Sequence, residues 1–331
     1  MSHQKHSFKK SSSIDCITSM QAIRAELKKA VVGQDDVIDQ IFIALLAKGN
    51  VLIEGVPGTA KSLLVRCIAD AIGCTFSRVQ FSVDLLPSDI VGLSTIAPNG
   101  KLDVIKGPVF ANFVMADEVN RAPPKTQSAL LEAMGEGQVS IGKKTFILQK
   151  PFFVLATENP LESSGTYPLP EAQLDRFLFK VVMYYPSKEE ETRVIEQNIS
   201  LRSLDSYGIR QVLSGKQIME LQEAAQQVKH NPRINKYIVD IVNATRTPKE
   251  YGIEKGKYLV VGASPRASIF LFMAGKANAL IEGKTHLMPQ HIKNVALPIL
   301  RHRIKLDYRA KIDGVTTDDI VEEILRKVPI P

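Results

Sequence analysis

The chain has 331 residues, of which 44% are hydrophobic and 23% are charged, and both values are typical of folded globular proteins. The longest unbroken apolar run covers residues 41–47, whereas a membrane helix needs ~20 such residues, so we expect no insertion into a membrane. Residues 1–10 lack the apolar segment of a secretory signal, and the three cysteines lack the spacing of a disulfide framework or a zinc site. Both features fit a reducing, cytoplasmic location.

The net charge of +7 is unevenly distributed along the chain. Residues 1–13 carry +3 without any acid, residues 14–186 carry −2, and residues 187–331 carry +6. The first segment is rich in Ser, Lys and His, and we expect it to be a disordered basic tail. Much of the remaining excess lies between Lys293 and Lys311, which leaves nucleic acid open as a partner.

Helices and strands are predicted to alternate between residues 14 and 186. Helices are expected over residues 14–30, from Asp35 or Asp36 onward, over 62–72 and over 124–135. Strands are expected over residues 50–54, 75–81, 112–116, 152–157 and 179–185. These strands are continuous apolar runs, as in sheets that are buried on both faces, so the sequence predicts an α/β domain with a doubly wound parallel sheet.

Two β-hairpins are predicted inside this domain. One covers about residues 88–108 around the turn Pro98-Asn99-Gly100, and the other covers about residues 137–149 around Gly142-Lys143-Lys144. After Pro186 strand signals are scarce and apolar residues recur at helical spacing. We therefore expect a linker over residues 187–210 and a smaller, all-helical domain over residues 211–331.

The segment Gly55-Val56-Pro57-Gly58-Thr59-Ala60-Lys61-Ser62 follows a predicted strand and opens a predicted helix, which is the context of a phosphate-binding loop. Glycines let backbone N–H groups converge on phosphate oxygens, and the helix N-terminus adds the positive end of its dipole. Lys61 would reach the β- and γ-phosphates, and Ser62 would bind Mg²⁺. Ala60 replaces the glycine of the strict pattern, and we expect the loop to tolerate it if its φ is negative.

Two acids, Asp117 and Glu118, end the apolar strand that begins near residue 112. A carboxylate at this strand end, beside the phosphate loop, would hold Mg²⁺ through water, and the next one could act as general base on the attacking water. A solvated strand end is the alternative. It becomes less attractive because the pair follows the phosphate loop by about 55 residues.

With both motifs in place, the chain resembles the MoxR family of AAA+ ATPases. The resemblance is carried by the phosphate loop and by four further blocks: Ala116-Asp117-Glu118-Val119-Asn120-Arg121-Ala122-Pro123-Pro124-Lys125-Thr126-Gln127, Ala156-Thr157-Glu158-Asn159-Pro160, Leu169-Pro170-Glu171-Ala172-Gln173-Leu174-Asp175-Arg176-Phe177 and Gly262-Ala263-Ser264-Pro265-Arg266-Ala267. It implies a P-loop NTPase core with a C-terminal helical lid domain, and it identifies the two hairpins as a helix-2 insert and a pre-sensor-1 hairpin. Glu158 departs slightly, since Gln is as common there in the family.

The resemblance also implies roles for individual residues. Asn159 would be sensor 1, which orients the attacking water; Arg176 would be an arginine finger acting on ATP of the neighbouring subunit; and Arg266 would be sensor 2, which contacts the γ-phosphate. Each has a plainer alternative: a turn Asn, an Asp175–Arg176 surface pair, and a helix start capped by Ser264. The implied nucleotide-binding set is Val32, Gly33, Gln34, Gly55, Pro57, Gly58, Thr59, Ala60, Lys61, Ser62 and Leu63, with Ser62 and Asp117 for the metal.

The implied function is that of a ring-forming, hexameric ATPase that uses ATP and Mg²⁺, releases ADP, and remodels, assembles or activates a protein partner. Proteins with a von Willebrand factor A domain are candidate partners. A nucleic-acid motor or loader of the same clade is the alternative, but the hairpin tips carry few bases (Lys101, Lys143 and Lys144). We therefore expect the basic segment Lys293–Lys311 to face phosphate or a neighbouring subunit, and only secondarily nucleic acid.

Overall fold

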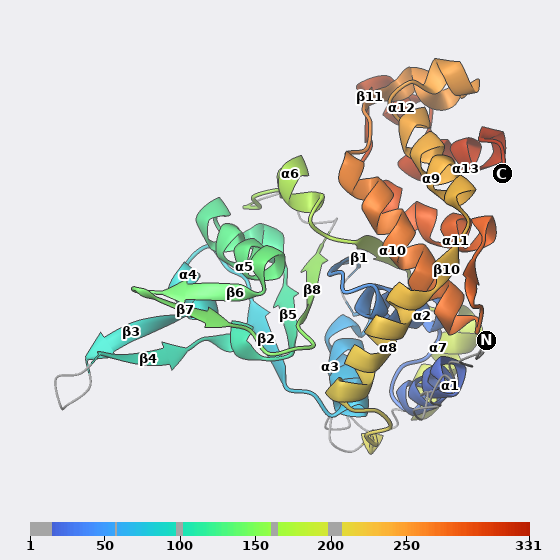
Figure 1. Ribbon diagram of the computed structural model, residues 1–331. Coiled ribbons are helices and arrows are strands. Elements are labelled where there is room, and N and C mark those ends of the chain that lie inside the picture. The colour runs from blue at the N-terminus through green and yellow to red at the C-terminus, as the bar shows by residue number, and fades with distance from the viewer. Residues whose placement is uncertain (1–14, 57, 97–101, 160–164, 198–206) are drawn as a thin grey trace, which may run out of the picture.

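A parallel five-stranded sheet lies at the centre of the first domain (Figure 1). The computed structural model describes residues 15–56, 58–96, 102–159, 165–197 and 207–331. The strand order is β2 (Phe76–Gln80), β5 (Phe113–Asp117), β8 (Phe153–Glu158), β1 (Val51–Gly55) and β9 (Phe179–Met183). All four pairings are parallel, and each strand lies within two residues of its predicted position, so the predicted sheet is confirmed.

Both faces of the sheet are buried, because successive side chains along a strand point to opposite faces. Val51 and Ile53 of β1 belong to the hydrophobic cluster on one face, and Leu52 belongs to the cluster on the other. The first cluster includes residues of α1 (Cys16–Leu27), α2 (Asp35–Leu46) and α3 (Lys61–Ile72), and the second includes residues of α5 (Pro124–Glu136). This is the doubly wound arrangement that the apolar strands predicted.

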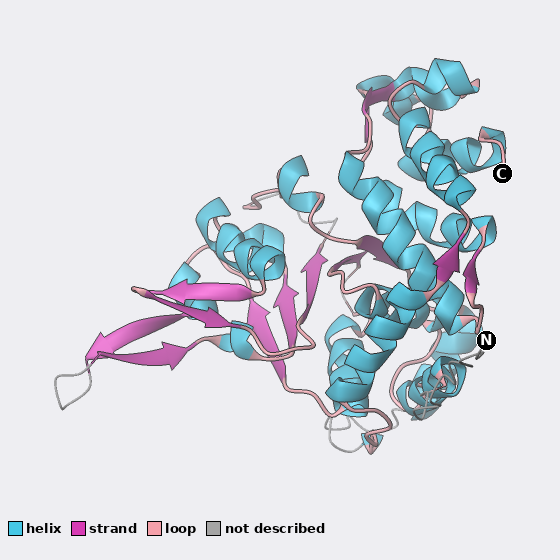
Figure 2. Cartoon of the chain, viewed as in Figure 1, coloured by secondary structure: helices cyan, strands magenta, loops and turns pink. Residues whose placement is uncertain are grey.

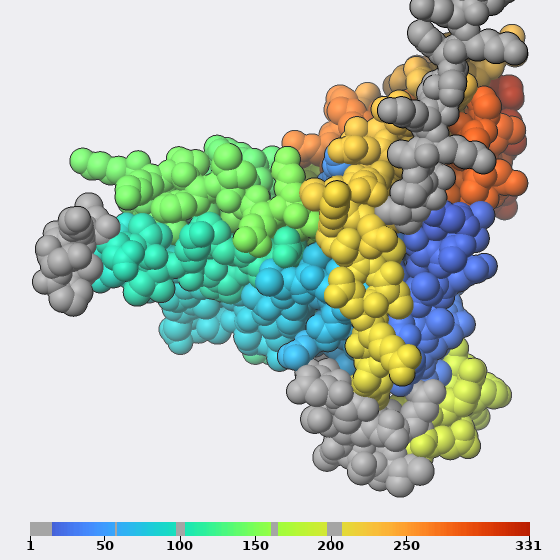
Figure 3. Space-filling model, turned by 60° about the horizontal axis from the view of Figure 1, so that its bottom comes forward, coloured from blue at the N-terminus to red at the C-terminus, as the bar shows by residue number. Residues whose placement is uncertain are grey.

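The two predicted hairpins are present, and both project from the sheet domain on the side away from the lid (Figures 1 and 3). The short helix α4 (Pro87–Val91) leads into the first, which pairs β3 (Gly92–Ile96) with β4 (Leu102–Lys106). The second pairs β6 (Gln138–Ile141) with β7 (Lys144–Ile147). The predicted turn at residues 98–100 and the predicted basic tail at residues 1–13 lie outside the described ranges.

The second domain, the lid, is mainly helical (Figure 2). Its helices are α8 (Gly215–Gln227), α9 (Pro232–Ala244), α10 (Pro265–Ile281), α11 (Pro289–Leu300), α12 (Tyr308–Ile312) and α13 (Thr317–Lys327). Two short strand pairs were not predicted: β10 (Lys229–His230) with β12 (His286–Leu287), and β11 (Leu259–Val261) with β13 (Lys305–Leu306). Within the predicted linker, α7 (Lys188–Gln197) is a helix.

The lid and the sheet domain share one hydrophobic core. α10 packs against α2 and α8, and the cluster on that face of the sheet runs without interruption from β1 to α11. Between β8 and β9, the one-turn helix α6 (Glu171–Leu174) lies next to the lid (Figure 1). Asp175, the residue that follows α6, contacts the lid before the chain enters β9.

Candidate nucleotide site

The phosphate loop joins the end of β1 to the start of α3. Gly58 has a φ of +83°, and the Thr59 hydroxyl donates a hydrogen bond of 3.0 Å to the Val56 carbonyl, which closes the turn. Ala60 has a φ of +58°, so the condition under which we expected the loop to tolerate alanine, a negative φ, is not met. A left-handed conformation costs an L-residue ~1–2 kcal/mol, so the loop keeps its glycine-like shape at the expense of local strain. Pro57 lies outside the described residues.

Lys61 is the first residue of α3, and its side chain folds back over the loop. The Nζ atom donates to the Gly55 carbonyl at 2.5 Å and to the Val56 carbonyl at 3.4 Å. Burial lowers the pKa of Lys61, and the negative charges of Asp117 and Glu118 oppose that shift. The structure thus brings Lys61 and both acids of the predicted pair within electrostatic reach of one another.

Asp117, at the end of β5, is a buried carboxylate with both oxygens engaged. Thr157 of β8 donates its hydroxyl proton to Oδ1 at 2.6 Å, and Arg78 of β2 pairs with Oδ2 at 2.5 Å. The neighbouring strands therefore fix this carboxylate from both sides. Neither Thr157 nor Arg78 was assigned a supporting role from the sequence, although their positions on the strands beside β5 are a signal for it.

Glu118 occupies a left-handed backbone conformation, with a φ of +55°. Its amide donates to the Thr157 hydroxyl oxygen at 2.8 Å, which helps to hold this unusual conformation. Its carboxylate accepts a hydrogen bond of 2.8 Å from Gln80 and forms an ion pair of 3.0 Å with Arg121. The second acid is thus turned out of the strand direction and aimed toward the end of β2.

Glu158 and Asn159 end β8, the strand between β1 and β5, so they lie at the same edge of the sheet as the phosphate loop and the acid pair. Asn159 is buried. Burial raises the pKa of Glu158; the cation of Lys180 partly offsets this shift, and the nearby Glu54 adds to it. Lys180 of β9 forms an ion pair with Glu54, so its charge is shared between Glu54 and Glu158.

We expect Glu158→Gln to stabilise the protein at neutral pH. Because the pKa is raised by folding, the folded state favours the protonated acid, and stability falls as pH rises from the ordinary carboxyl range toward the folded pKa. The melting temperature of the variant should exceed that of the wild type at pH 7.5, and the difference should shrink as pH falls to about 4. The exposed Glu132→Gln is the control; an equal rise there would contradict the prediction.

A hollow of about 340 Å³ lies beside the segment expected to contact the base of the nucleotide. It is lined by residues that include Gly33, Gln34, Val182, Tyr184, Glu190 and Arg301. Gly33 has a φ of +74°, and a Cβ at this position would meet the Glu190 carboxylate. The Gln34 amide reaches the Tyr184 carbonyl at 3.5 Å. Val32, which precedes Gly33 in the chain, is half-buried and does not line the hollow.

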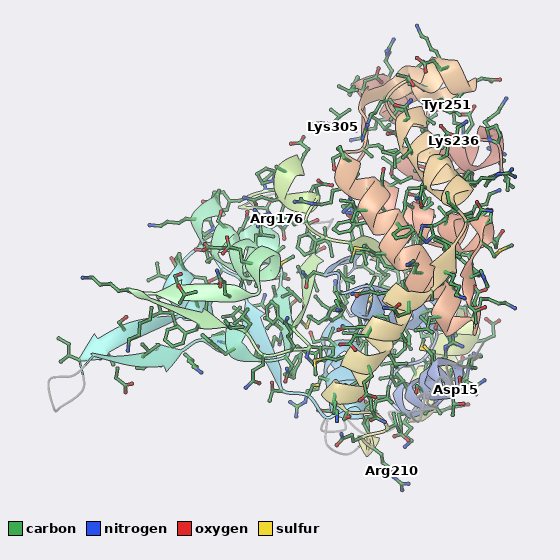
Figure 4. The ribbon with its side chains drawn as sticks, in the orientation of Figure 1. Asp15, Arg176, Arg210, Lys236, Tyr251 and Lys305 are labelled. Atoms are coloured by element: carbon green, nitrogen blue, oxygen red, sulfur yellow. The ribbon has the colours of Figure 1, made fainter. Side chains whose placement is uncertain are left out.

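Arg176 lies apart from this group, between α5 and α6 (Figure 4). It is exposed, and its Nη1 donates to the Leu131 carbonyl of α5 at 2.7 Å. A Cβ on Gly135 would approach Nη1 to 3.0 Å, so this helical glycine leaves room for the guanidinium. The Leu178 amide, two residues on, donates to the carbonyl of Asn50, the residue before β1. The five residues of β1, ~16 Å at ~3.3 Å each, separate this point from the phosphate loop.

Arg266 lies near Arg176, at the boundary of the two domains. Its Nη1 is 3.4 Å from Oδ2 of Asp175, the residue before Arg176. Ser264 caps α10, as expected, since its hydroxyl accepts from the Arg266 amide. Arg266 is thus linked to the residue that precedes Arg176, whereas the Arg176 guanidinium itself contacts α5. The phosphate loop and the acid pair form the other part of the candidate site.

The basic segment between Lys293 and Lys311 is largely neutralised by partners within the chain. Arg301 pairs with Asp318 at 2.9 Å, and Arg303 pairs with Asp175 at 2.9 Å. Two more exposed pairs join Lys305 to Glu171 and Arg309 to Asp307. Among the described residues, no ion pair is recorded for Lys293 or Lys311. The segment mainly closes the domain boundary, which weakens its interpretation as a nucleic-acid surface.

Residues 50–179 match the family model "ATPase family associated with various cellular activities (AAA)", and residues 255–324 match the AAA lid domain. The chain is 44% identical over 310 residues to Chaperone MoxR1 of Mycobacterium tuberculosis, with 92% of this chain and 81% of that protein covered. It is 30% identical over 325 residues to Protein MoxR of Methylorubrum extorquens, with 92% and 93% covered. A crystal structure of a candidate ATPase from Cytophaga hutchinsonii matches it with a TM-score of 0.88, 44% identity and 96% coverage of both chains.

The fold and the site therefore define a nucleotide-binding protein of the AAA+ ATPase class. The chain belongs to the MoxR family within that class. In the part of the chain that the structure describes, no helix has the length and apolarity to cross a membrane. Within the same ranges, no three His, Cys, Asp or Glu side chains gather into a metal-binding group.

Proposed function

We propose that the chain hydrolyses ATP to ADP and phosphate. The observation that carries this proposal is the gathering of Lys61, Asp117 and Glu118 at the edge where β1 and β5 end. Lys61 would bind the phosphates, and Glu118 would take a proton from the attacking water, which Asn159 would orient. The adenine base of ATP would occupy the hollow beside Gly33 and Gln34.

We also propose that the reaction depends on Mg²⁺. Ser62 and Asp117 offer a hydroxyl and a carboxylate, the oxygen donors that suit this ion. The Asp117 carboxylate is already fixed by Thr157 and Arg78, so it needs little reorganisation to act as a ligand or to hold a bound water. When bound, the ion would neutralise charge on the β- and γ-phosphates.

The active form is proposed to be a ring, hexameric as in the family resemblance. Arg266 contacts Asp175, the residue before Arg176, and Leu178, two residues after Arg176, lies a strand's length from the phosphate loop. In a ring, the arginines of one subunit would meet the nucleotide bound by the next. A fixed guanidinium there stabilises the charge that develops on the transferred phosphoryl group.

The proposed output is remodelling, assembly or activation of a protein partner in the cytoplasm, with von Willebrand factor A domain proteins as one candidate class. Support comes from the projecting hairpins, where the side chains of Ile96, Ile105 and Ile147 are 73%, 57% and 78% exposed. Such exposed apolar side chains suit contact with a protein more than with a phosphate backbone. The three cysteines are free, which fits a reducing compartment.

Turnover per subunit should rise with protein concentration. If the arginines serve the neighbouring nucleotide, a separated subunit has only half of the site, so hydrolysis requires assembly. Phosphate release is measured over a dilution series, with light scattering on the same samples to follow assembly and Lys61→Ala to set the background rate. A constant rate per subunit down to samples that are monomeric by scattering would contradict the shared site.

A further inference from the structure

Asp175 is held at the domain boundary by three side chains of the lid. Arg303 Nε donates to Oδ1 at 2.9 Å, the Ser264 hydroxyl donates to Oδ2 at 2.8 Å, and Arg266 Nη1 is 3.4 Å from the same oxygen. The carboxylate side chain is only 19% exposed, so these contacts are partly shielded from solvent. Asp175 thus connects the core, one residue before Arg176, with the N-terminus of α10.

Arg303 fixes the backbone around this carboxylate. Its buried guanidinium donates to the carbonyls of Asp175 at 3.0 Å and Leu178 at 3.2 Å, and it bonds the Phe177 carbonyl as well. It also lies over the Phe270 ring, 4.9 Å from the centroid. Because several donors of one rigid group bind a single turn, the position of the Asp175 carboxylate is well defined.

Asp175 contacts Arg266 but engages only part of its guanidinium group. The contact uses one nitrogen, Nη1, at a long 3.4 Å, whereas two shorter parallel bonds would be needed to engage the full fork. The Arg266 side chain is 45% exposed, so the remaining N–H groups are available to a phosphate that arrives from outside. If Asp175 held Arg266 away from the nucleotide, we would expect two parallel hydrogen bonds between them, and this pair has one.

We propose that Asp175 is a positioning residue that holds Arg266 in the orientation needed to contact the nucleotide of the neighbouring subunit. This inference rests on the proposed function, because it assigns a cause to the placement of one of the two arginines. The carboxylate, fixed by Arg303 and Ser264, limits the swing of the long Arg266 side chain before nucleotide arrives. The Arg266 side chain then loses less conformational entropy when it is ordered for hydrolysis.

The test is a double-mutant cycle with Asp175→Asn and Arg266→Ala, read as steady-state ATP hydrolysis under conditions where the wild type is assembled. Asp175→Asn should lower kcat about tenfold with KM for ATP unchanged, since the phosphate loop that binds ATP is untouched. In the Arg266→Ala background, the same change should lower kcat by no more than about twofold, because the group it orients is gone.

Asp175→Glu is the second variant, because Asp175→Asn leaves the buried Arg303 without its counter-charge and could unfold the lid. The glutamate keeps the charge but moves the carboxylate outward by one methylene, so we expect a folded protein with a smaller loss of kcat. Glu171→Gln is the matched control: it removes the exposed 2.7 Å pair with Lys305 at the same domain boundary, and kcat should stay at the wild-type value.

Folded Asp175 variants with wild-type kcat, or an equal loss in the two backgrounds, would overturn the positioning role and leave the proposed function intact. A wild-type protein that does not hydrolyse ATP in the assembled state would instead contradict the proposed function, and the inference with it. Loss of kcat in Glu171→Gln as large as in Asp175→Asn would show that the domain boundary in general, and not the orientation of Arg266, sets the rate.

Discussion

Replacement of Glu118 by glutamine is expected to leave ATP binding intact and to lower hydrolysis by at least ~100-fold, the usual scale for a lost general base. The amide has nearly the same size as the carboxylate and can stay within reach of Gln80, but it cannot take a proton from water. The left-handed backbone at this position is fixed by the bond from the Glu118 amide to Thr157, which the substitution leaves in place. Binding is measured by calorimetry with ATP and turnover by phosphate release.

Two variants separate a chemical effect from a structural one. Lys61→Ala should lose ATP affinity itself, because in the proposed site the Lys61 ammonium is the group that would contact the phosphates. Glu132→Gln, on the exposed face of α5, should match the wild type in both measurements. Unchanged turnover in Glu118→Gln would remove this residue from the mechanism, and lost binding would mean that its side chain shapes the nucleotide site instead of acting on water.

The sheet was predictable because its strands are buried on both faces. β5 and β8 are runs of apolar residues that no helical periodicity fits, and each ends in a polar residue at the same edge. The short strands of the lid were not predictable, because a pairing such as β10 with β12 covers two residues and is set by how α9 and α11 pack.

The candidate site also contains residues that local sequence indicates and residues whose contacts depend on the fold. Lys61, Asp117 and Glu118 could be proposed from local spacing, because Lys61 starts the helix after β1 and the two acids lie at the end of β5. Thr157 and Asp175 could not be assigned their contacts, because their partners lie on other strands or in the other domain. The φ of Ala60 could not be predicted for a related reason: alanine disfavours a positive φ, yet Ala60 adopts one in the turn between β1 and α3.

Arg176→Ala should lower hydrolysis by ~10³-fold or more in the assembled protein, the range found for an arginine that completes a phosphoryl-transfer site. Affinity for ATP should change little, because the phosphate loop of the same subunit remains whole. Arg176 now rests on the Leu131 carbonyl of α5, and this single neutral acceptor is weak enough to be exchanged for a phosphate. The exposed Arg326→Ala, at the end of α13, is the control and should retain full turnover.

Mixing two inactive variants shows whether Arg176 acts on the nucleotide of a neighbouring subunit or on the nucleotide of its own subunit. Lys61→Ala subunits cannot bind ATP well but still carry Arg176, whereas Arg176→Ala subunits bind ATP and lack the guanidinium. If Arg176 acts across the interface, a Lys61→Ala subunit supplies the missing group to its Arg176→Ala neighbour, and the mixture hydrolyses ATP faster than either variant alone. A mixture no faster than the average of its components would contradict action across the interface and would mean that Arg176 acts within its own subunit.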